Sequence, residues 1–477
     1  MARSPDGPSS RSLSRIVSGR RSFRRRRSGT RGHDRKPTVH MEGMGDAMRT
    51  RSKDEDLKDR TPVLVIGGGP VGLVVSGLLA QRGIRNCVVE RRREAQCAPA
   101  AHVLRKRPME ILDRLGVGEA VRRARSPLPL DFITWVTTLD GKEIGRLDLR
   151  PVDPETGVRG PEPWTNCAQN VLEPILLRHV ETLPEARILR GAEWLGLDQG
   201  DDCVTARIRL EEGTESFVEA SWVVAADGAG SPTRRRLGIP MEGPGPLARF
   251  AMIHFEADLT PWIRDRPGPI LWIMNPESPG TLIVHDPGAS HVFMMPMQGT
   301  RDGDGERAER EAIPARLAAA LGVPVTPRIL SIDEWSPHVQ VAERYREGRV
   351  FLVGDAAHRF PPTGGLGLNT GIQEAADLVD RLAGVVSGTA PETLLDGYES
   401  TCRPVARANA HESFENMKRL GEITGVIGAP PDLKSLEERL SSFSREEAQR
   451  LARAIEAQRS HFLSDGLVPG DSASPSR

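Results

Sequence analysis

Residues 61–72 read TPVLVIGGGPVG. Within this stretch, Pro62 to Ile66 is an apolar run of strand length, and the glycines that follow it, Gly67 to Gly69, end the strand. Val71 to Leu79 then has the composition of a buried helix, and Asn86 to Glu90 has that of a second strand. The order strand, glycine turn, helix, strand indicates the first unit of an α/β domain.

Three glycines, Gly67, Gly69 and Gly72, follow the pattern G-x-G-x-x-G at the junction of this strand and helix. The first glycine permits a tight turn, the second lets a pyrophosphate approach the backbone, and the third allows close packing of helix on strand. The N-terminus of this helix offers amide hydrogens and a positive dipole to phosphates. Glu90, at the end of the second strand, can accept hydrogen bonds from a ribose. The spacing predicts a dinucleotide-binding site rather than a tight turn alone.

Two later segments have the same strand-then-turn character. Residues 222–236 read WVVAADGAGSPTRRR, in which a buried strand ends at Asp227-Gly228. Residues 348–369 read GRVFLVGDAAHRFPPTGGLGLN, in which a strand ends at Gly354-Asp355 and three glycines precede the next helix. Such a glycine loop can bring backbone N–H groups to a polar or anionic ligand. Asp355 could bind a sugar or polyol hydroxyl, or it could cap the turn.

Together these segments resemble the three motifs of the class A FAD-dependent monooxygenases, which include p-hydroxybenzoate and phenol hydroxylases. The likeness is closest to the chlorophenol and aromatic-polyketide hydroxylases, through Ala101-His102-Val103-Leu104, Gln169 to Pro174 and His285-Asp286-Pro287. It covers roughly residues 61–425. The resemblance implies an α/β fold, with a Rossmann-like FAD-binding domain interleaved with a β-sheet substrate domain, plus C-terminal helices.

The same resemblance implies an FAD site. The first glycine motif would hold the pyrophosphate, the acid of the second strand the adenosine ribose, and the last motif the ribityl chain and the isoalloxazine. The Asp-Gly pair would serve FAD and NAD(P)H together, and Gln169 would lie near the flavin's ribityl and dimethylbenzene side. The residues expected to contact cofactor are Gly67, Gly69, Pro70, Gly72, Glu90, Arg91, Arg107, Gln169, Asp227, Gly228, Asp355, Pro362, Gly365, Gly367, Leu368 and Asn369.

The sequence departs from the family at two places. An arginine that usually precedes the Ala-His-Val stretch is Ala100, and an Arg-Thr pair that usually opens the next helix is Arg107-Pro108. Arg105, Lys106 or Arg107 would then supply the phosphate contact, since proline is tolerated in a first helical turn. Many relatives also continue into a thioredoxin-like domain, which we expect to be absent here.

The chemistry implied is aromatic hydroxylation by an NAD(P)H-dependent flavin monooxygenase. NAD(P)H would reduce FAD, O2 would add at C4a, and the distal oxygen of the hydroperoxide would attack a phenolic or polyketide-derived ring. No second G-x-G-x-x-G occurs, so NAD(P)H is expected to bind transiently. Baeyer–Villiger oxidation, epoxidation and dehydrogenation on FAD remain alternatives, as does a degenerate flavoprotein without activity.

A base that ionises the phenol would help this reaction. His102 is the candidate, because histidine titrates near neutrality and the resemblance puts this residue beside the ring. A packed histidine without catalytic duty is the alternative, and His285 is a second choice. An apolar wall for the substrate is expected from the strand-rich part of the chain, although such residues can equally be core; the candidate substrate-binding residues are Met252, Trp272, His285, Phe293 and Met295.

Charge and cysteine usage limit the other function classes. Residues 1–60 carry 17 basic and 8 acidic residues in a chain with 65 of each, so the remainder is acidic, which argues against a nucleic-acid partner. The apolar run at 61–81 is broken by glycines and is not expected to span a membrane. No Cys or His residues occur at the spacing of a metal site, and a reducing cytoplasm is expected. A monomer or homodimer is also expected. The five cysteines are scattered along the chain: Cys87, Cys97, Cys167, Cys203 and Cys402.

The chain is therefore expected to divide into five parts. Helices are predicted at 107–125, 169–180, 370–386, 392–425 and 445–461, and mostly antiparallel strands at 249–299. The parts are a disordered basic tail at 1–60, a discontinuous FAD-binding domain at 61–245 and 340–425, a substrate-binding sheet at 246–339, C-terminal helices at 426–462 and a disordered tail at 463–477.

Overall fold

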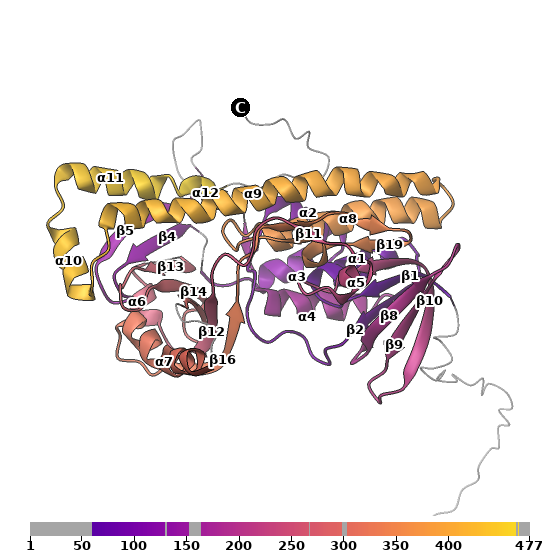
Figure 1. Cartoon of the computed structure of the whole chain (residues 1–477), viewed down its shortest axis with the longest axis horizontal. Coiled ribbons are helices and arrows are strands. Elements are labelled where there is room, and N and C mark those ends of the chain that lie inside the picture. The colour runs from indigo at the N-terminus through magenta and orange to yellow at the C-terminus, as the bar shows by residue number, and fades with distance from the viewer. Residues whose placement is uncertain are drawn as a thin grey trace, which may run out of the picture. The chain divides into compact units, whose positions relative to one another are not determined.

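The computed structural model describes residues 60–128, 131–151, 164–266, 268–297 and 303–463, with Gly466 (Figure 1). Nearly all of the two tails predicted to be disordered, 1–60 and 463–477, falls outside these residues. Among the helices so described, none is both long enough and apolar enough to cross a bilayer.

The first sheet is built around the strand that precedes the glycine turn. Five of its strands are parallel neighbours in the order β19, β10, β1, β2, β7, and β18 pairs antiparallel with β19. The first half of the long β10 pairs antiparallel with β9, which pairs with β8. The bounds are β1 (Thr61–Ile66), β2 (Asn86–Glu90), β7 (Ala186–Arg190), β8 (Glu193–Gln199), β9 (Val204–Arg209), β10 (Glu215–Ala225), β18 (Arg346–Glu347) and β19 (Val350–Leu352).

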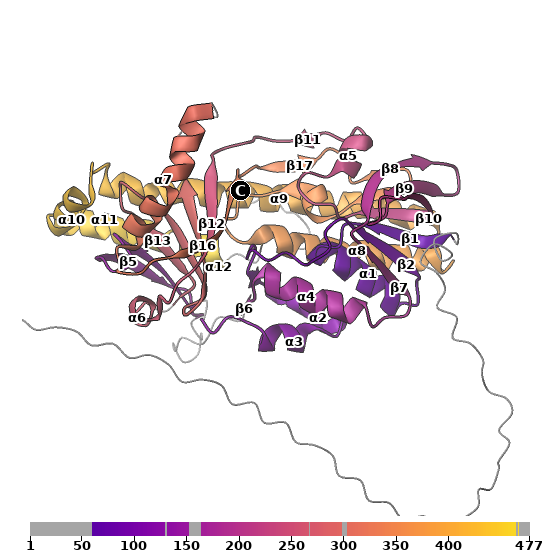
Figure 2. The same ribbon diagram turned by 90° about the horizontal axis from the view of Figure 1, so that it is seen from below.

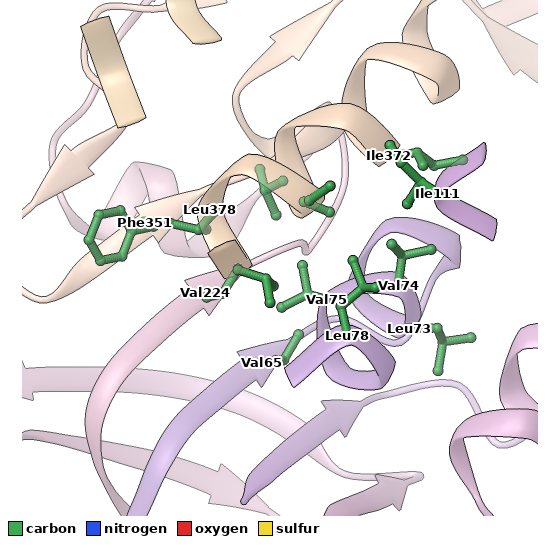
Figure 3. Packing of buried hydrophobic residues seen from close by; sticks show 14 of the residues in the cluster. Val65, Leu73, Val74, Val75, Leu78, Ile111, Val224, Phe351, Ile372 and Leu378 are labelled. Carbon is green, nitrogen blue, oxygen red and sulfur yellow. The ribbon is translucent and has the colours of Figure 1, made fainter. Parts of the chain in front are cut away.

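Helices cover one face of this sheet, and the β8–β9–β10 meander covers the other. On the helical face, apolar side chains from β1, β10 and β19 pack against the helices α1 and α8 (Figure 3). On the opposite face, alternate residues of the same strands pack against β8 and β9. The helices of this part are α1 (Pro70–Gln81), α2 (Lys106–Arg114), α3 (Gly118–Arg123), α4 (Gln169–Val180), α5 (Pro232–Arg236) and α8 (Leu366–Val386).

A second sheet has the order β16, β12, β15, β14, β13, β4, β5 and is antiparallel except for the β13–β4 pair. The antiparallel strands predicted at 249–299 are confirmed. The hairpin β4–β5 joins this sheet although it lies within 61–245, and the division of the chain into domains remains a prediction. The bounds are β4 (Phe132–Val136), β5 (Glu143–Asp148), β12 (Phe250–Glu256), β13 (Ile270–Ile273), β14 (Gly280–Asp286), β15 (Ser290–Pro296) and β16 (Arg328–Trp335).

The two faces of the second sheet have different coverings. One face forms an apolar core with α6 (Thr260–Ile263) and α7 (Gly303–Leu321). The other face, at the β13–β4–β5 end, packs against the C-terminal helices α9 (Asp396–Ile427), α10 (Leu433–Ser441) and α11 (Arg445–Glu456), next to α12 (Arg459–Leu463). Helix α9 runs along both sheets (Figures 1 and 2). Its first turns pack in the core of the first sheet, and its last turns pack on the second sheet.

Short elements connect these layers. The strands β11 (Met241–Glu242), β17 (Gln340–Ala342) and β20 (His358–Arg359) form a small antiparallel sheet, and β3 (Val103–Leu104) pairs with β6 (Thr165–Asn166). Two 3-10 turns, η1 (Gly354–Ala356) and η2 (Glu392–Leu395), precede β20 and α9. The helix predicted at 107–125 is divided into α2 and α3 around Gly116, whose φ of +87° is unfavourable for other residues.

Candidate cofactor and substrate site

The three predicted motifs converge at one edge of the first sheet. Gly67, Asp227 and Gly354 follow the carboxyl ends of β1, β10 and β19, which are adjacent parallel strands. A Cβ on Gly67 would collide with the carbonyl of Ala226, so the first two turns touch. In open α/β sheets, ligands bind in the crevice outside the carboxyl ends of the strands.

The glycines of the first turn have the predicted geometry. Gly67 has a φ of +103°, and a Cβ on Gly72 would collide with the carbonyl oxygen of Gly67. In contrast, a Cβ on Gly69 would meet no atom within 4 Å. No side chain caps the N-terminus of α1, which begins at Pro70. The space above Gly69 and the uncapped amides of α1 therefore fit the pyrophosphate of a dinucleotide.

Glu90 is held by the glycine turn. One of its carboxylate oxygens accepts the N–H of Gly68 at 2.7 Å, and the other accepts the N–H of Arg92 at 2.7 Å. The Arg92 guanidinium pairs with Glu90 at 3.2 Å and with Glu173 at 3.2 Å. Arg91, which was predicted to contact the cofactor, is exposed and makes no hydrogen bond or ion pair to the described residues. Arg92 was not predicted, although it lies two residues after the strand-end acid Glu90.

One carboxylate oxygen of Asp227 is available to a ligand. Its Oδ2 accepts the N–H of Thr233 at 3.0 Å, whereas its Oδ1 is buried without a partner among the described residues. The adjacent Gly228 has a φ of +79°, and a Cβ there would meet open space. A buried acceptor without a donor fits a bound ligand that carries hydroxyl or amide donors.

The third turn exposes Asp355. Its carboxylate makes no hydrogen bond within the described part of the chain, and desolvation by surrounding protein raises its pKa, opposed by the charges of His358 and Arg359. Beneath it, Glu374 accepts the N–H of Gly354 at 2.9 Å and lies 3.0 Å from His358 Nε2. His358 and Glu374 are both fully buried. Asp355 therefore lies on a rigid turn, open to a ligand.

The buried pair gives a prediction about stability. Burial alone would lower the pKa of His358, but the Glu374 carboxylate and Asp355 raise it above its ordinary 6.5. A raised folded-state pKa stabilises the fold fully below pH 6.5, and this stabilisation is lost as pH rises through the folded pKa. Glu374→Gln should lower the free energy of unfolding by about 3 kcal/mol at about pH 6 and flatten its decline toward about pH 9.

Urea unfolding of the flavin-loaded protein across this pH range measures both effects. Glu415→Gln is the matched control, because Glu415 forms an exposed ion pair with Lys418 and its loss should leave the free energy of unfolding nearly unchanged. Parallel pH profiles for the wild type and Glu374→Gln would show that the pair does not contribute as described.

The glycine loop before α8 is tied to the segment 103–105. Gly365, with a φ of +63°, begins the helix without a side-chain cap, and a Cβ on Gly367 would meet open space. Asn369 is buried, accepts the N–H of Arg105 at 2.9 Å and donates to the carbonyls of Val103 and Gly365. The side chain of Asn369 thus holds the loop. The loop's open backbone and its exposed Pro362 and partly buried Leu368 remain available to a planar ring.

Of the three basic residues considered for the phosphate contact, Arg105 is the one that lies next to this loop. Arg105 is buried, its Nη2 donates to the carbonyl of Gly364 at 2.5 Å, and its guanidinium lies 4.2 Å from the Trp164 ring centroid. Arg107 is exposed and pairs with Glu110 on its own helix. The reason is that α2 begins at Lys106, so Arg105 is the N-cap residue at the loop while Arg107 points to the outer surface.

Two histidines meet near this loop, one just before β3 and the other on β14. His102 and His285 are both buried, with ring centroids 5.5 Å apart and planes at 89°. Burial lowers the pKa of His102, opposed by its hydrogen bond to Asn166, and lowers the pKa of His285 far below its ordinary value. Both rings are therefore neutral at neutral pH. Gln169 lies nearby, because its N–H donates to the carbonyl of Ala101 at 2.8 Å.

The predicted substrate residues divide between the two faces of the second sheet. Met252, Trp272 and His285 lie on one face, whereas the side chains of Phe293 and Met295 are fully buried in the apolar core with α7 on the opposite face. The register adds Thr281 and Met294, which pair with Trp272 and Met252 on the first face and were not predicted. Trp272 Nε1 and His285 Nε2 are buried without partners among the described residues.

Comparison with known proteins agrees with this geometry. A putative polyketide hydroxylase of Streptomyces halstedii is 38% identical over 360 residues, which cover 74% of this chain and 64% of that protein. The 2,4-dichlorophenol 6-monooxygenase of Cupriavidus pinatubonensis is 32% identical over 412 residues, covering 81% and 66%. The chain thus spans slightly less than two thirds of each of these relatives. The flavin-dependent monooxygenase PieE, solved with FAD and substrate, has a TM-score of 0.78 at 29% identity, covering 88% of this chain and 77% of PieE.

The fold and the converging turns define a flavoprotein with a dinucleotide-binding α/β sheet and a second, antiparallel sheet. The family model described as FAD binding domain matches residues 60–413. The chain belongs to this FAD-binding family.

Proposed function

We propose that the protein is an FAD-dependent monooxygenase that hydroxylates an aromatic, phenolic or polyketide-derived substrate with NAD(P)H and O2. The observation that carries the proposal is the convergence of three motifs, from β1, β10 and β19, at one sheet edge. Relatives with the names polyketide hydroxylase and 2,4-dichlorophenol 6-monooxygenase support the substrate class.

The chain's own residues would hold both ligands. The turn around Gly69 would bind the FAD pyrophosphate, Glu90 the ribose, and Asp355 the ribityl hydroxyls. When bound, FAD supplies two-electron reduction by NAD(P)H and activation of oxygen. The glycine loop before α8 would present its backbone to the isoalloxazine, with Arg105 behind it.

The second sheet would hold the substrate ring. Met252 and Trp272 would form an apolar floor that excludes water, and the buried Trp272 Nε1 and His285 Nε2 would pair with polar groups of the substrate. His102 would take the proton of a ring hydroxyl, because its pKa leaves it neutral at neutral pH. A phenolate is more electron-rich than a phenol and is the better nucleophile.

Further expectations concern partners and location. We propose a monomer or homodimer that acts on small molecules in a reducing cytoplasm. The five cysteines are free thiols, which supports that location.

The purified protein should be yellow, and its NAD(P)H oxidation should be stimulated by phenols or polyketide quinones in stopped-flow screening. Mass spectrometry should find that the product gains one oxygen atom and that this atom derives from labelled O2, and NMR should place it as a ring hydroxyl. A colourless protein that ignores added FAD, or a product that only loses two hydrogens, would overturn the proposal. A product with oxygen inserted into a carbon–carbon bond would indicate Baeyer–Villiger oxidation, and an epoxide product would indicate epoxidation.

A further inference from the structure

We infer that Asn166 is a positioning residue, which fixes the tautomer of His102 so that its Nε2 carries the lone pair offered to the substrate hydroxyl. This inference rests on the proposed function for the role of His102, but its geometry stands alone. The juxtaposition is formed by the short β3–β6 pair, in which Val103 lies opposite Asn166.

The orientation of the Asn166 amide follows from its two neighbours. One end of the amide lies 2.9 Å from His102 Nδ1, and the other lies 3.3 Å from the carbonyl oxygen of Leu128. The carbonyl of Leu128 can only accept, so the amide nitrogen faces it and Oδ1 faces His102. The reverse orientation would put two acceptor oxygens against each other.

The tautomer of His102 then follows. An amide oxygen only accepts hydrogen bonds, so Nδ1 of His102 must carry the proton. In the neutral ring, Nε2 is consequently the acceptor. Nε2 makes no hydrogen bond to any described residue. The ring is therefore held as an acceptor with no partner of its own, whereas neutral histidine in water favours the opposite tautomer.

Asn166 is well supported for this task. It is buried, its backbone carbonyl accepts the N–H of Ser126 at 2.7 Å, and the N–H of Cys167 donates to the carbonyl of His102 at 2.7 Å. Ser126 Oγ also donates to the carbonyl of His285 at 2.8 Å. These hydrogen bonds tie the backbone around His102 and that around His285 to the same segment, residues 126–167. The titratable group that packs against the His102 ring is His285, which is itself neutral.

The test is the 15N NMR signature of His102 in flavin-loaded protein labelled at histidine, at a pH where the ring is neutral. His102 should show the Nδ1–H tautomer without any substrate, and the signal is assigned from its loss in His102→Gln. Asn166→Leu should shift the ring toward the Nε2–H tautomer. Asn166→Asp, which keeps an acceptor, should retain Nδ1–H. Asn170→Leu is the matched control, since among the described residues the Asn170 side chain bonds only to the carbonyl of Cys97 and its loss should change nothing.

A kinetic readout accompanies the spectra. Asn166→Leu should lower kcat for hydroxylation on the order of 100-fold, the lower range for loss of a general base, with FAD content unchanged. A wild-type Nε2–H tautomer, or an unchanged tautomer in Asn166→Leu, would overturn the inference. Failure of the proposed function looks different, because the tautomer results would stand while the wild type hydroxylates no aromatic compound.

Discussion

Gly69→Trp should produce a folded protein that no longer binds FAD. A Cβ at this position meets no protein atom within 4 Å, so the backbone can carry a side chain there, but the indole would occupy the space expected for the pyrophosphate. Loss of two charge-assisted hydrogen bonds to backbone amides, each about 1.5–3 kcal/mol, corresponds to at least about 100-fold weaker binding. Flavin absorbance of the purified protein and titration with FAD measure the loss.

Gly421→Trp is the matched control. Gly421 lies on the exposed surface of α9, and a Cβ there also meets open space. This variant should bind FAD as the wild type does, and circular dichroism should report the same fold for both variants. If Gly69→Trp copurifies with a full complement of flavin, the cofactor does not lie against the first glycine turn.

The first turn could be predicted because its constraints are local. A positive φ at Gly67, open space at Gly69 and a close backbone approach at Gly72 are each required by the residues next to them, and the pattern of glycines records all three. The strands at 249–299 could be predicted equally well, since each is a short run of β-forming residues bounded by turns. The convergence of the three motifs followed from the resemblance and is seen in the parallel pairing of β1, β10 and β19.

Other features depend on contacts that the sequence does not record locally. Alternation along β15 separates its residues into two faces, but only the helices that cover the sheet decide that Phe293 and Met295 face the core. The parallel pairing of β4 with β13 joins segments more than a hundred residues apart. Helix α7 was missed because its first half is rich in charged residues and Pro314 lies inside it. Its apolar residues Ile313, Leu317 and Leu321 do have helical spacing and pack in the core.

Two features of the candidate site depend on such contacts as well. Arg105 and Arg107 are two residues apart, and the exact start of α2 decides which one reaches the glycine loop. Asn166 has no motif of its own, and its importance follows from the pairing of β6 with β3. The resemblance and the near-neutral titration of histidine could suggest His102 as a base, but only the three-dimensional arrangement supplies its orienting partner.

His102→Ala should uncouple NAD(P)H oxidation from hydroxylation. The imidazole is the neutral acceptor nearest to His285 and is held by Asn166, so its removal leaves the substrate hydroxyl without a proton acceptor. General-base loss typically costs about 100- to 10,000-fold in rate, and we expect product formation to fall by about 100-fold or more. NAD(P)H consumption should continue, because FAD binding depends on the glycine turns. Product yield per NAD(P)H, measured by mass spectrometry, gives the coupling.

The pH dependence separates a base from a packing residue. Because burial lowers the pKa of His102, the ring stays neutral to below pH 6.5, and the acid limb of wild-type hydroxylation should lie below that value. In His102→Ala this limb should disappear, while any limb from the adjacent His285 remains. His411→Ala, at an exposed position on α9, should preserve both rate and profile. Unchanged coupling in His102→Ala would leave His102 as a packed histidine, and the proton would then have to leave the substrate by another route.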